Sequence, residues 1–273
     1  MTGRRGFSLV EMVIVLVLAG IVSTAAITMF STQNRLNAAM TALGESQENA
    51  RSAVQLAAAE LRSATGGSVV SATATELAVR IPIVIGVICA VQPGNNTHVY
   101  FPMDVSAMNM RRDADGKAHL SQNGEWHWRN LGGADGYRPT SRQECIANGA
   151  GQVGTDENYA MVRATDPVGS PIMLYREVVY SFAPSSLDDT RRAFYRTRGS
   201  ERVELAQGFS STSQFEYRLL SDTVWRSSVA NGQVGDIASI RLNVAVEGEG
   251  SSGSATADAH FSLQREIQLR GAR

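Results

Sequence analysis

The sequence has 273 residues, enough for one sizeable domain with appended segments. Its 25 Lys and Arg side chains nearly balance 26 Asp and Glu side chains, so the formal net charge is -1. This balance provides no overall positive field, and nucleic acid is not expected as a partner.

The first thirty residues join a basic start to a long apolar run. Arg4 and Arg5 precede residues 7–30, in which Glu11 is the single charged side chain. At about 1.5 Å per residue this run is about 36 Å long, which is enough to cross the hydrocarbon core of a bilayer. Because flanking basic residues stay in the cytoplasm, the amino end is expected there and the chain after Phe30 across the membrane.

Glu11 is an unusual side chain for a membrane-spanning run. An ionisable group at membrane depth costs on the order of 3 kcal/mol, so its presence requires a partner or a function. The alternative is a signal anchor in which Glu11 lies near the interface, where a carboxylate costs less.

The apolar run continues into a more polar helix without a break. The first proline is Pro82, and no glycine lies between Gly44 and Gly66. One stripe of this helix recurs at steps of three and four residues and consists of Leu36, Met40, Leu43, Gln47, Ala50, Val54, Ala57 and Leu61. Gly66-Gly67 supplies a C-terminal stop. The sequence therefore predicts one helix over residues 7–66, with a membrane-spanning first half and a second half that lies against a globular domain.

The start of this helix carries a recognisable motif. GFSLVEM, from Gly6 to Met12, follows the basic leader MTGRR, with Glu at the fifth place counted from Phe7. It resembles the class III signal of type IV prepilins and pseudopilins. The resemblance implies a leader peptide of residues 1–6, cleavage between Gly6 and Phe7 by a prepilin peptidase, and methylation of the new amino group of Phe7. It also implies that Glu11 neutralises the terminal amine of a neighbouring subunit during assembly, since a paired buried charge can set the register between helices.

Partners and location follow from the same resemblance. The implied partners are other major and minor pilins, the prepilin peptidase and the inner-membrane assembly platform. The chain is expected to be a single-pass inner-membrane protein with a cytoplasmic N-terminus and a periplasmic C-terminal domain, which enters the surface fibre on assembly. The apolar segment lacks the proline of many major pilins, which favours a minor pilin or a pseudopilin.

Residues 67–273 change to the pattern of β-strands. Runs rich in β-branched and aromatic residues, several with period-two alternation, are separated by turn-forming residues. The expected strands are 76–84, 98–103, 159–165, 172–182, 191–198, 201–207, 213–220, 237–247 and 260–270. APSSLDD and EGEGSSGSATADA are expected to be hairpin loops. The predicted fold class is α+β, a pilin-like long N-terminal helix packed on a mainly antiparallel sheet.

The second half of the chain carries a further resemblance. REVVYSF, RRAFYRTR, ERVELAQGFSSTSQFEYRLL, IASIRLNVAV and HFSLQREIQLR are similar to the sheet of PilW-like minor pilins and of the J-type pseudopilin of type II secretion. QENARSAVQLAAAELRSA in the helix also resembles the PilW-like pattern. The implied function is a minor pilin that initiates type IV pilus assembly or lies at its tip. The alternatives are a J-type pseudopilin and an adhesive pilus subunit that binds a surface or DNA.

Residues 85–158 do not follow this pattern and are expected to be loops braced by short strands. Cys89 and Cys145 are the two cysteines of the sequence, and they lie outside any CxxC or Cys/His zinc spacing. In an exported segment a Cys89–Cys145 disulfide is expected, closing about 57 residues and contributing on the order of 4 kcal/mol in the chain-entropy model. The alternative is two free buried thiols.

Catalytic and metal-binding motifs are missing from the sequence. The histidines show neither ligand spacing nor an HExxH motif and are interpreted as exposed or structural; they are His98, His119, His127 and His260. No GxSxG elbow and no phosphate-binding glycine loop occur. The sequence therefore predicts no enzyme, no cofactor and no metal, and disfavours the alternative of a membrane-anchored periplasmic enzyme.

Two short segments of the loop-rich region remain open to interpretation. DADGK, with Asp113 and Asp115, resembles the opening of a calcium loop, but it lacks the later acidic ligands and is interpreted as a turn. EWHW carries Trp126 and Trp128, which are expected either on a contact surface or as core residues.

Overall fold

The structure is a computed structural model that describes residues 9–92, 97–102, 115–120, 124, 126–130, 160–163, 168–247 and 260–269. These residues form a long helix, α1 (Leu9–Leu61), a short 3-10 helix, η2 (Asn231–Asp236), and a set of strands. The strands are β1 (Val69–Ala72), β2 (Glu76–Gln92), β3 (Thr97–Pro102), β4 (Gly116–Leu120), β5 (Trp126–Asn130), β6 (Ala160–Arg163), β7 (Pro171–Pro184), β8 (Arg192–Arg198), β9 (Glu201–Phe209), β10 (Gln214–Leu219), β11 (Ile237–Glu247) and β12 (His260–Gln268).

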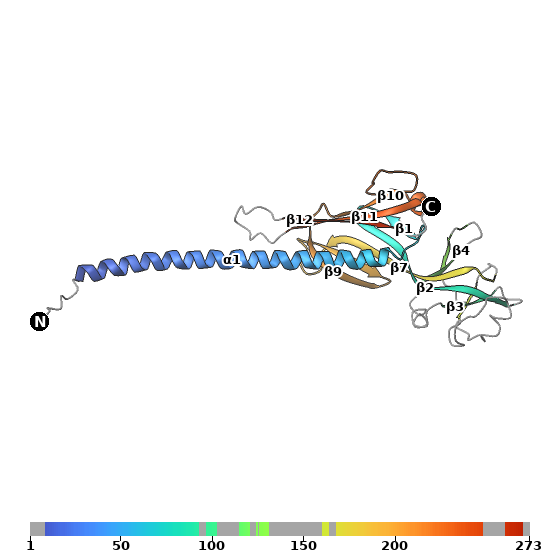
Figure 1. The fold of residues 1–273 in the computed structure, drawn as a ribbon, viewed down its shortest axis with the longest axis horizontal. Helices are drawn as coiled ribbons and strands as arrows, with labels where there is room; N and C mark the ends of the chain where they lie inside the picture. Colours follow the sequence, from blue (N-terminus) through green and yellow to red (C-terminus); the bar gives the residue numbers. More distant parts are fainter. Residues whose placement is uncertain are drawn as a thin grey trace.

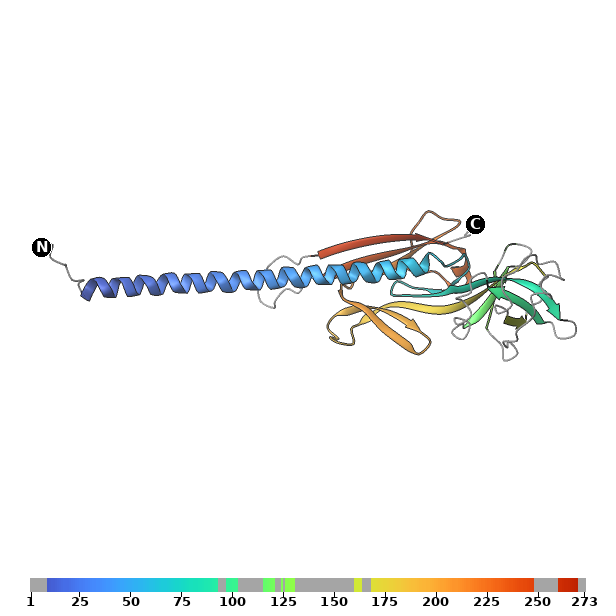
Figure 2. The same ribbon diagram turned by 60° about the horizontal axis from the view of Figure 1, so that its bottom comes forward.

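The strands form one sheet in which every described pair is antiparallel. Its main order is β10-β11-β9-β8-β7-β2-β3-β6, with β1 beside β2, β12 beside β11, β4 beside β7 and β5 beside β4. The last turns of α1 lie between β11 and β12 on one side and β9 on the other, while its first half projects away from the sheet (Figures 1 and 2). The α+β, pilin-like architecture predicted from the sequence is confirmed.

Two long strands divide the sheet into two parts. β2 and β7 pair from Glu76 opposite Ser181 to Val87 opposite Pro171, and they continue beyond the end of α1 (Figure 2). Beside the helix, β7 also pairs with β8; beyond it, β2 carries β3 and β7 carries β4. We call the part of the sheet beside α1 the helix-packed sheet. We call the part beyond the end of α1, which is made of β3 to β6 and the distal ends of β2 and β7, the distal lobe.

The core of the helix-packed sheet combines small helix side chains with aromatic strand side chains. The buried helix residues are Ala50, Ala53, Val54, Ala57, Ala58 and Leu61. Phe182, Phe194, Phe209 and Phe215 form a ring cluster opposite them, with Phe182 and Phe194 centroids 4.9 Å apart. Alanine on the helix allows the close approach that the large rings require.

The helix enters the domain later along the chain than the predicted stripe indicates. Leu36 and Met40 belong to that stripe, yet they are 51% and 61% exposed, and full burial begins at Ala50. The second half of the helix lies against the domain as expected, but its buried part is limited to the turns from Ala50 to Leu61. The strands beside α1 end before they reach these residues, so the stripe continues past the sheet (Figure 1).

The helix ends at Leu61, a few residues before the predicted end. Ser63 donates both its amide N–H (3.0 Å) and its hydroxyl (2.6 Å) to the carbonyl of Glu60, which converts the last turn into a tight i to i−3 turn. Gly67 then adopts a φ of 79°, in the left-handed region that favours glycine. The start of the predicted helix at residue 7 lies outside the described residues.

Most predicted strands are confirmed, and the main differences concern the distal lobe. β2 runs to Gln92 instead of ending at residue 84. Pro82, which has no N–H to donate, does not end the strand, because the β2–β7 ladder shifts its register between Pro82 and Val84. β1, β4 and β5 were not predicted. They are four or five residues long, too short for periodicity to show. The hairpin loop APSSLDD is confirmed between β7 and β8, whereas residues 248–259 lie outside the described part.

Candidate functional site

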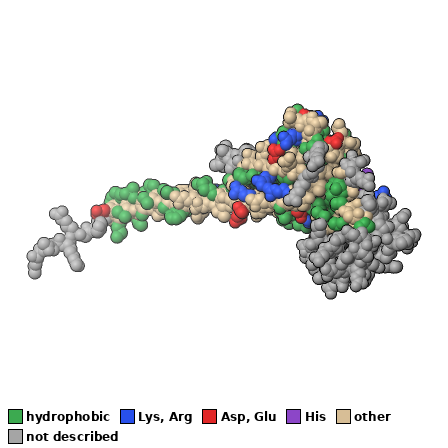
Figure 3. Space-filling model, turned by 45° about the vertical axis from the view of Figure 1, so that its right-hand side comes forward, with side chains coloured by type: hydrophobic (Ala, Val, Ile, Leu, Met, Phe, Trp, Pro, Cys, Tyr) green, Lys and Arg blue, Asp and Glu red, His purple; other side chains and the backbone are tan. Residues whose placement is uncertain are grey.

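The first half of α1 is an apolar surface without a partner inside the domain. By length and composition α1 can cross a membrane, and its most apolar stretch is not buried within the molecule. Leu16 is 69% and Phe30 is 68% exposed, and hydrophobic side chains gather along the projecting part of the helix on the face shown in Figure 3. Apolar area of this kind is stable in a membrane or against other helices, because water disfavours it.

The threonine hydroxyl groups in this half of the helix are satisfied within it. Thr24 donates its hydroxyl to the carbonyl of Gly20 (2.8 Å), and Thr28 donates to the carbonyl of Thr24 (2.9 Å). Such bonds to the preceding turn leave no hydroxyl hydrogen unpaired when water is absent. The threonines are therefore compatible with the interior of a membrane.

Glu11 lies in the first described turn of α1, and its side chain is exposed. A carboxylate in this position interacts favourably with the positive end of the helix dipole. The dipole offsets only part of the cost of a charge at membrane depth, so an additional cationic partner remains favourable. Gly6 and Phe7, the predicted cleavage and methylation positions, lie outside the described residues.

At the other end of α1, an ion pair joins the helix to the sheet. Both carboxylate oxygens of Glu60 accept from Arg196 of β8, Oε1 from Nη2 at 2.8 Å and Oε2 from Nε at 3.0 Å. The Tyr180 hydroxyl of β7 also donates to Glu60. The side chains of Arg196 and Glu60 are 19% and 26% exposed, so this bidentate pair is largely removed from water.

The two proton donors of this cluster, the Tyr180 phenol and the Arg196 guanidinium, keep their protons at neutral pH. Burial, followed by the hydrogen bond to Glu60, raises the pKa of Tyr180, so the phenol stays protonated and donates. The hydrogen bond to Glu60 also raises the pKa of Arg196, so the guanidinium stays charged. The cluster holds the end of the helix against β7 and β8 at neutral pH.

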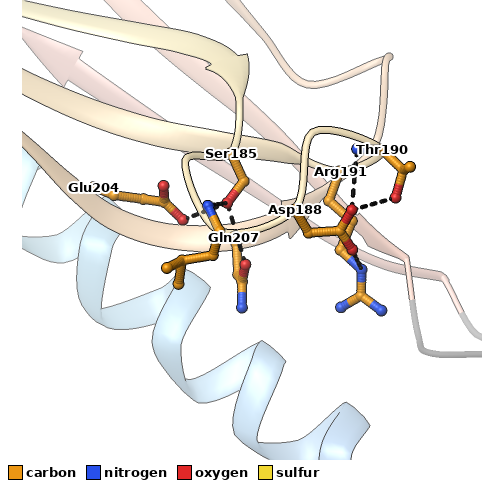
Figure 4. Close-up of polar contacts among 7 residues, drawn as sticks. Ser185, Asp188, Thr190, Arg191, Glu204 and Gln207 are labelled. Carbon is orange, nitrogen blue, oxygen red and sulfur yellow. Dashed lines mark hydrogen bonds and ion pairs between the residues drawn. The ribbon is translucent and has the colours of Figure 1, made fainter.

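The loop between β7 and β8 is braced by two carboxylates (Figure 4). Glu204 of β9 accepts from the hydroxyl of Ser185 (2.8 Å), the amide of Ser186 (2.9 Å) and the hydroxyl of Tyr195 (2.8 Å). Burial acts to raise the pKa of Glu204, but these hydrogen bonds outweigh it and lower the pKa to about 2. The carboxylate therefore remains an acceptor over the whole neutral range.

Asp188 organises the tip of the same loop. It accepts from the amide (3.1 Å) and the hydroxyl (2.6 Å) of Thr190 and pairs with Arg191 at 3.2 Å. The hydrogen bonds from Thr190 lower the pKa of Asp188. This is an Asx-type turn, which rigidifies a hairpin and needs no ligand.

An aromatic and cationic cluster joins β5 to the long strands of the distal lobe. The Arg80 guanidinium lies over the rings of Trp128 (5.2 Å) and Tyr175 (5.5 Å), and these two rings meet edge to face at 5.1 Å. Gly116 is required here, because a Cβ at this position would overlap the Tyr175 hydroxyl. Trp126 and Trp128 pack on the Ala118, Met173 and Tyr175 core, which supports the interpretation of the tryptophans as core residues.

The remaining sequence-predicted residues are not gathered into a site by the described structure. Asp115 accepts the amide of Glu177 (2.8 Å), a structural bond that fixes β4 against β7, and Asp113 lies outside the described residues. His127 is exposed on β5. Within the described part of the chain, no cluster of three or more His, Cys, Asp or Glu residues could hold a metal ion.

Three histidines and one cysteine are described only in their backbone: His98 in β3, His119 in β4, His260 in β12 and Cys89 in β2. Cys145 lies outside the described residues, so the Cys89–Cys145 disulfide stays a prediction. Sequence reasoning missed the Glu60, Arg196 and Tyr180 cluster, because Glu60 is separated from Tyr180 by 120 residues and from Arg196 by 136. The local sequence signal for this cluster is Glu60, a glutamate next to an otherwise apolar helix face.

Comparison with known families matches residues 1–27 to the prokaryotic N-terminal methylation motif. No curated protein and no solved structure matches the chain. The match confirms the type IV prepilin-like start that GFSLVEM indicated and, with the exposed apolar helix, supports membrane anchoring by α1. It supports a pilin-like or pseudopilin-like protein, indicates a structural subunit, and links the chain in general to the pilin and prepilin-peptidase machinery.

Proposed function

We propose that this chain is a PilW-like minor pilin that takes part in type IV pilus assembly, in initiation or at the tip of the fibre. The observation that carries the proposal is the division of α1. Its first half follows a prepilin-like motif and is apolar and exposed, while its last turns are buried in a sheet and held by Glu60. A subunit built in this way presents one half of the helix to neighbouring helices and keeps the other as the core of its own domain.

The proposed chemistry of the N-terminus follows the motif. A prepilin peptidase at the cytoplasmic face cuts after Gly6 and methylates the amino group of Phe7, which leaves Glu11 as the fifth residue of the mature chain. Before assembly the domain is periplasmic and α1 spans the inner membrane, where the assembly platform acts on it. Intact-mass analysis of the assembled protein tests this step through the loss of MTGRRG and the gain of one methyl group.

We further propose that Glu11 binds the terminal amine of an adjacent subunit. The exposed position of Glu11 at the start of the helix supports this, since a carboxylate there is accessible to a second helix in the membrane. Distal to the membrane, a Cys89–Cys145 disulfide is proposed to close the loop-rich region, and non-reducing peptide mapping tests it by the recovery of a linked peptide.

The decisive experiment compares wild type, Glu11→Ala and Glu11→Asp for copurification with pilins at equal protein levels. We expect Glu11→Ala to reduce recovery by at least about tenfold, and Glu11→Asp to fall between the two because it keeps the charge but shortens the reach. Glu45→Ala, at an exposed position of the same helix, is the matched control and should recover pilins as wild type does. Equal recovery from all variants would refute the assembly role of Glu11.

The identity of the recovered subunits separates the candidate roles. Recovery of pilins supports a PilW-like subunit, whereas recovery of type II secretion pseudopilins supports the J-type alternative. An adhesive subunit would retain pilin recovery and in addition bind a surface or DNA through its domain.

A further inference from the structure

Three described strands of the helix-packed sheet, β10, β9 and β12, have an edge to which another strand could be added. The edges of β10 and β9 are protected. The outer edge of β10 is covered by the segment after it that contains Arg226 and Val229, which we call the strap. The amides and carbonyls of Tyr217 in β10 and Arg226 in the strap exchange hydrogen bonds of 2.8 and 2.9 Å. The same strap reaches β1, where the Val229 amide donates to the carbonyl of Ala72 at 3.0 Å. These bridges satisfy backbone groups that would otherwise attract another chain.

The edge of β9 is protected by its geometry. Its ladder with β8 shifts register between Arg192 and Ala193 and again between Phe194 and Tyr195. Gly208 adds a φ of 88°. Bulges and left-handed glycines twist an edge away from regular pairing, which is how natural sheets prevent unwanted strand addition.

The edge of β12 has none of these protections within the described structure. β12 pairs with β11 in an unbroken register from Ser239 opposite Gln268 to Glu247 opposite His260. It contains no proline, no lysine and no bulge, and none of the described strands lies against its other edge. A regular, extended edge of this length is a template for an added strand.

The hydrogen-bond phase of β12 identifies which backbone groups face outward. The Leu269 amide donates to the carbonyl of Ala238 at 3.0 Å, and these two residues continue the register of the β11–β12 pair. Bonded and non-bonded pairs alternate in an antiparallel ladder, so the next bonded residues of β12 are Ile267, Arg265, Leu263 and Phe261. The intervening residues direct their N–H and C=O groups to the free edge; they are Ser262, Gln264, Glu266 and Gln268.

We propose that β12 accepts an extended segment of another pilin subunit, which pairs with this free edge and enlarges the sheet. The side chains define its chemistry. Phe261, Leu263 and Arg265 lie on the helix-facing side, since they pair with the buried Val246, Val244 and Leu242. Phe261 and Leu263 are half-buried and Arg265 is exposed, so the segment has aliphatic residues beside the first two and an acidic residue beside Arg265.

A second copy of this chain fits the edge poorly. Two β12 strands paired about a twofold axis bring together residues of the same face, and the helix-facing residues of β12 include no acid to meet Arg265. A different subunit is therefore the proposed occupant. The inference rests on the proposed function, because it presumes a fibre that supplies other pilins.

The test uses the full-length chain in membranes with the other pilins co-produced. Gln264→Pro removes an outward N–H without removing a backbone bond to β11, and we expect pilin recovery to fall by at least about tenfold. It also removes the side-chain bond from Gln264 Nε2 to Asn243 Oδ1 of β11 (3.0 Å), which the Gln264→Thr control removes as well. Gln264→Thr keeps the N–H and should recover pilins within about twofold of wild type. Arg265→Glu reverses the charge beside the acid of the incoming segment and should also lower recovery. The thermal transition of the domain is measured for each variant.

Amide hydrogen exchange supplies an independent readout. In the complex the amides of Gln264 and Glu266 should exchange at least about tenfold more slowly, while those of Leu263 and Arg265 are already protected by β11 in the free chain. Protection of Gln264 and Glu266 in the isolated chain at high concentration would indicate self-pairing and overturn the proposal.

The outcomes separate this proposal from the proposed function. If wild type recovers no pilins, the pilin function fails and the edge proposal fails with it. If wild type and a folded Gln264→Pro variant recover pilins equally, the edge proposal alone is wrong. Should Gln264→Pro unfold the domain, Arg265→Glu decides, because it alters an exposed side chain and leaves the backbone intact; wild-type recovery would then overturn the proposal.

Discussion

The two halves of α1 both present apolar surface, the first all round and the second along one face, and they differ in the size and exposure of these side chains. From Leu9 to Phe30 the large hydrophobic side chains of the helix are more than half exposed. From Ala50 to Leu61 the buried side chains are mostly alanine. A helix that meets lipid carries apolar side chains all round, whereas a helix that enters a sheet lined with phenylalanine needs small ones.

This difference teaches that hydrophobicity along a helix does not by itself reveal where the helix enters its domain. Leu36 and Met40 continue the apolar stripe but remain exposed, because the sheet does not extend to them. The position of the boundary depends on the length of the strands beside the helix. Substitutions on the two sides of the boundary should therefore have very different effects on the stability of the domain.

The largest expected effect separates Leu61 from Leu36. Leu61 is fully buried, so Leu61→Ala should lower the free energy of unfolding of the domain by about 3 kcal/mol through lost burial and a cavity. Leu36→Ala, at a half-exposed position of the same helix, should change it by less than about 0.5 kcal/mol. Denaturant unfolding of the full-length chain in detergent, followed by domain tryptophan fluorescence, measures both. Similar losses for the two variants would contradict the division of α1.

The next effect concerns the ion pair at the end of the helix. Glu60→Gln keeps the shape of the side chain but leaves the partly buried Arg196 guanidinium without its counter-charge, which should cost about 2 kcal/mol of domain stability. Glu45→Gln, an exposed position on α1 nearer the membrane, should have no measurable effect. Thermal unfolding of both variants measures the difference, and an unchanged transition for Glu60→Gln would show that the pair does not hold helix and sheet together.

The smallest effect lies in the braced loop and depends on pH. The pKa of Glu204 is lowered to about 2 in the folded domain, whereas an unfolded glutamate titrates near about 4.3. The stabilisation is therefore fully present above about pH 4.3 and is lost as the pH falls through about 2. Because the site is partly open to solvent, Glu204→Gln should cost only about 1 kcal/mol at pH 7.

The control for this titration is Glu201→Gln, at an exposed position on the same strand. Domain stability measured between pH 2 and 5 should fall less steeply in Glu204→Gln than in wild type, while Glu201→Gln should retain the wild-type slope. Equal slopes for all three proteins would mean that Glu204 does not contribute to acid sensitivity. Membrane anchoring by α1 should be unaffected by either substitution.

Features encoded in short stretches of sequence were predictable. The apolar length of α1 sets a membrane-spanning helix, and alternation with turn residues located most strands from β6 to β12, because backbone geometry repeats over a few residues. GFSLVEM is likewise a linear signal, so Gly6, Phe7 and Glu11 could be proposed as site residues without any fold. The strands β1, β4 and β5 were missed because so few residues carry no clear period.

By itself, the sequence determined the apolar half of α1, which is long enough to cross a membrane, the prepilin-like motif and the α+β class, all of which depend on local patterns of side-chain polarity. Tertiary structure alone decided where α1 enters the domain, which residues pair with Glu60, and which strand is left at the edge of the sheet. Arg196 and Tyr180 meet Glu60 only because β7 and β8 pass beside the last turn of the helix. Among the described strands the strap closes the edge of β10 and the bulges protect that of β9, while none lies against the outer edge of β12. Such contacts between distant segments have no periodic signature in the chain.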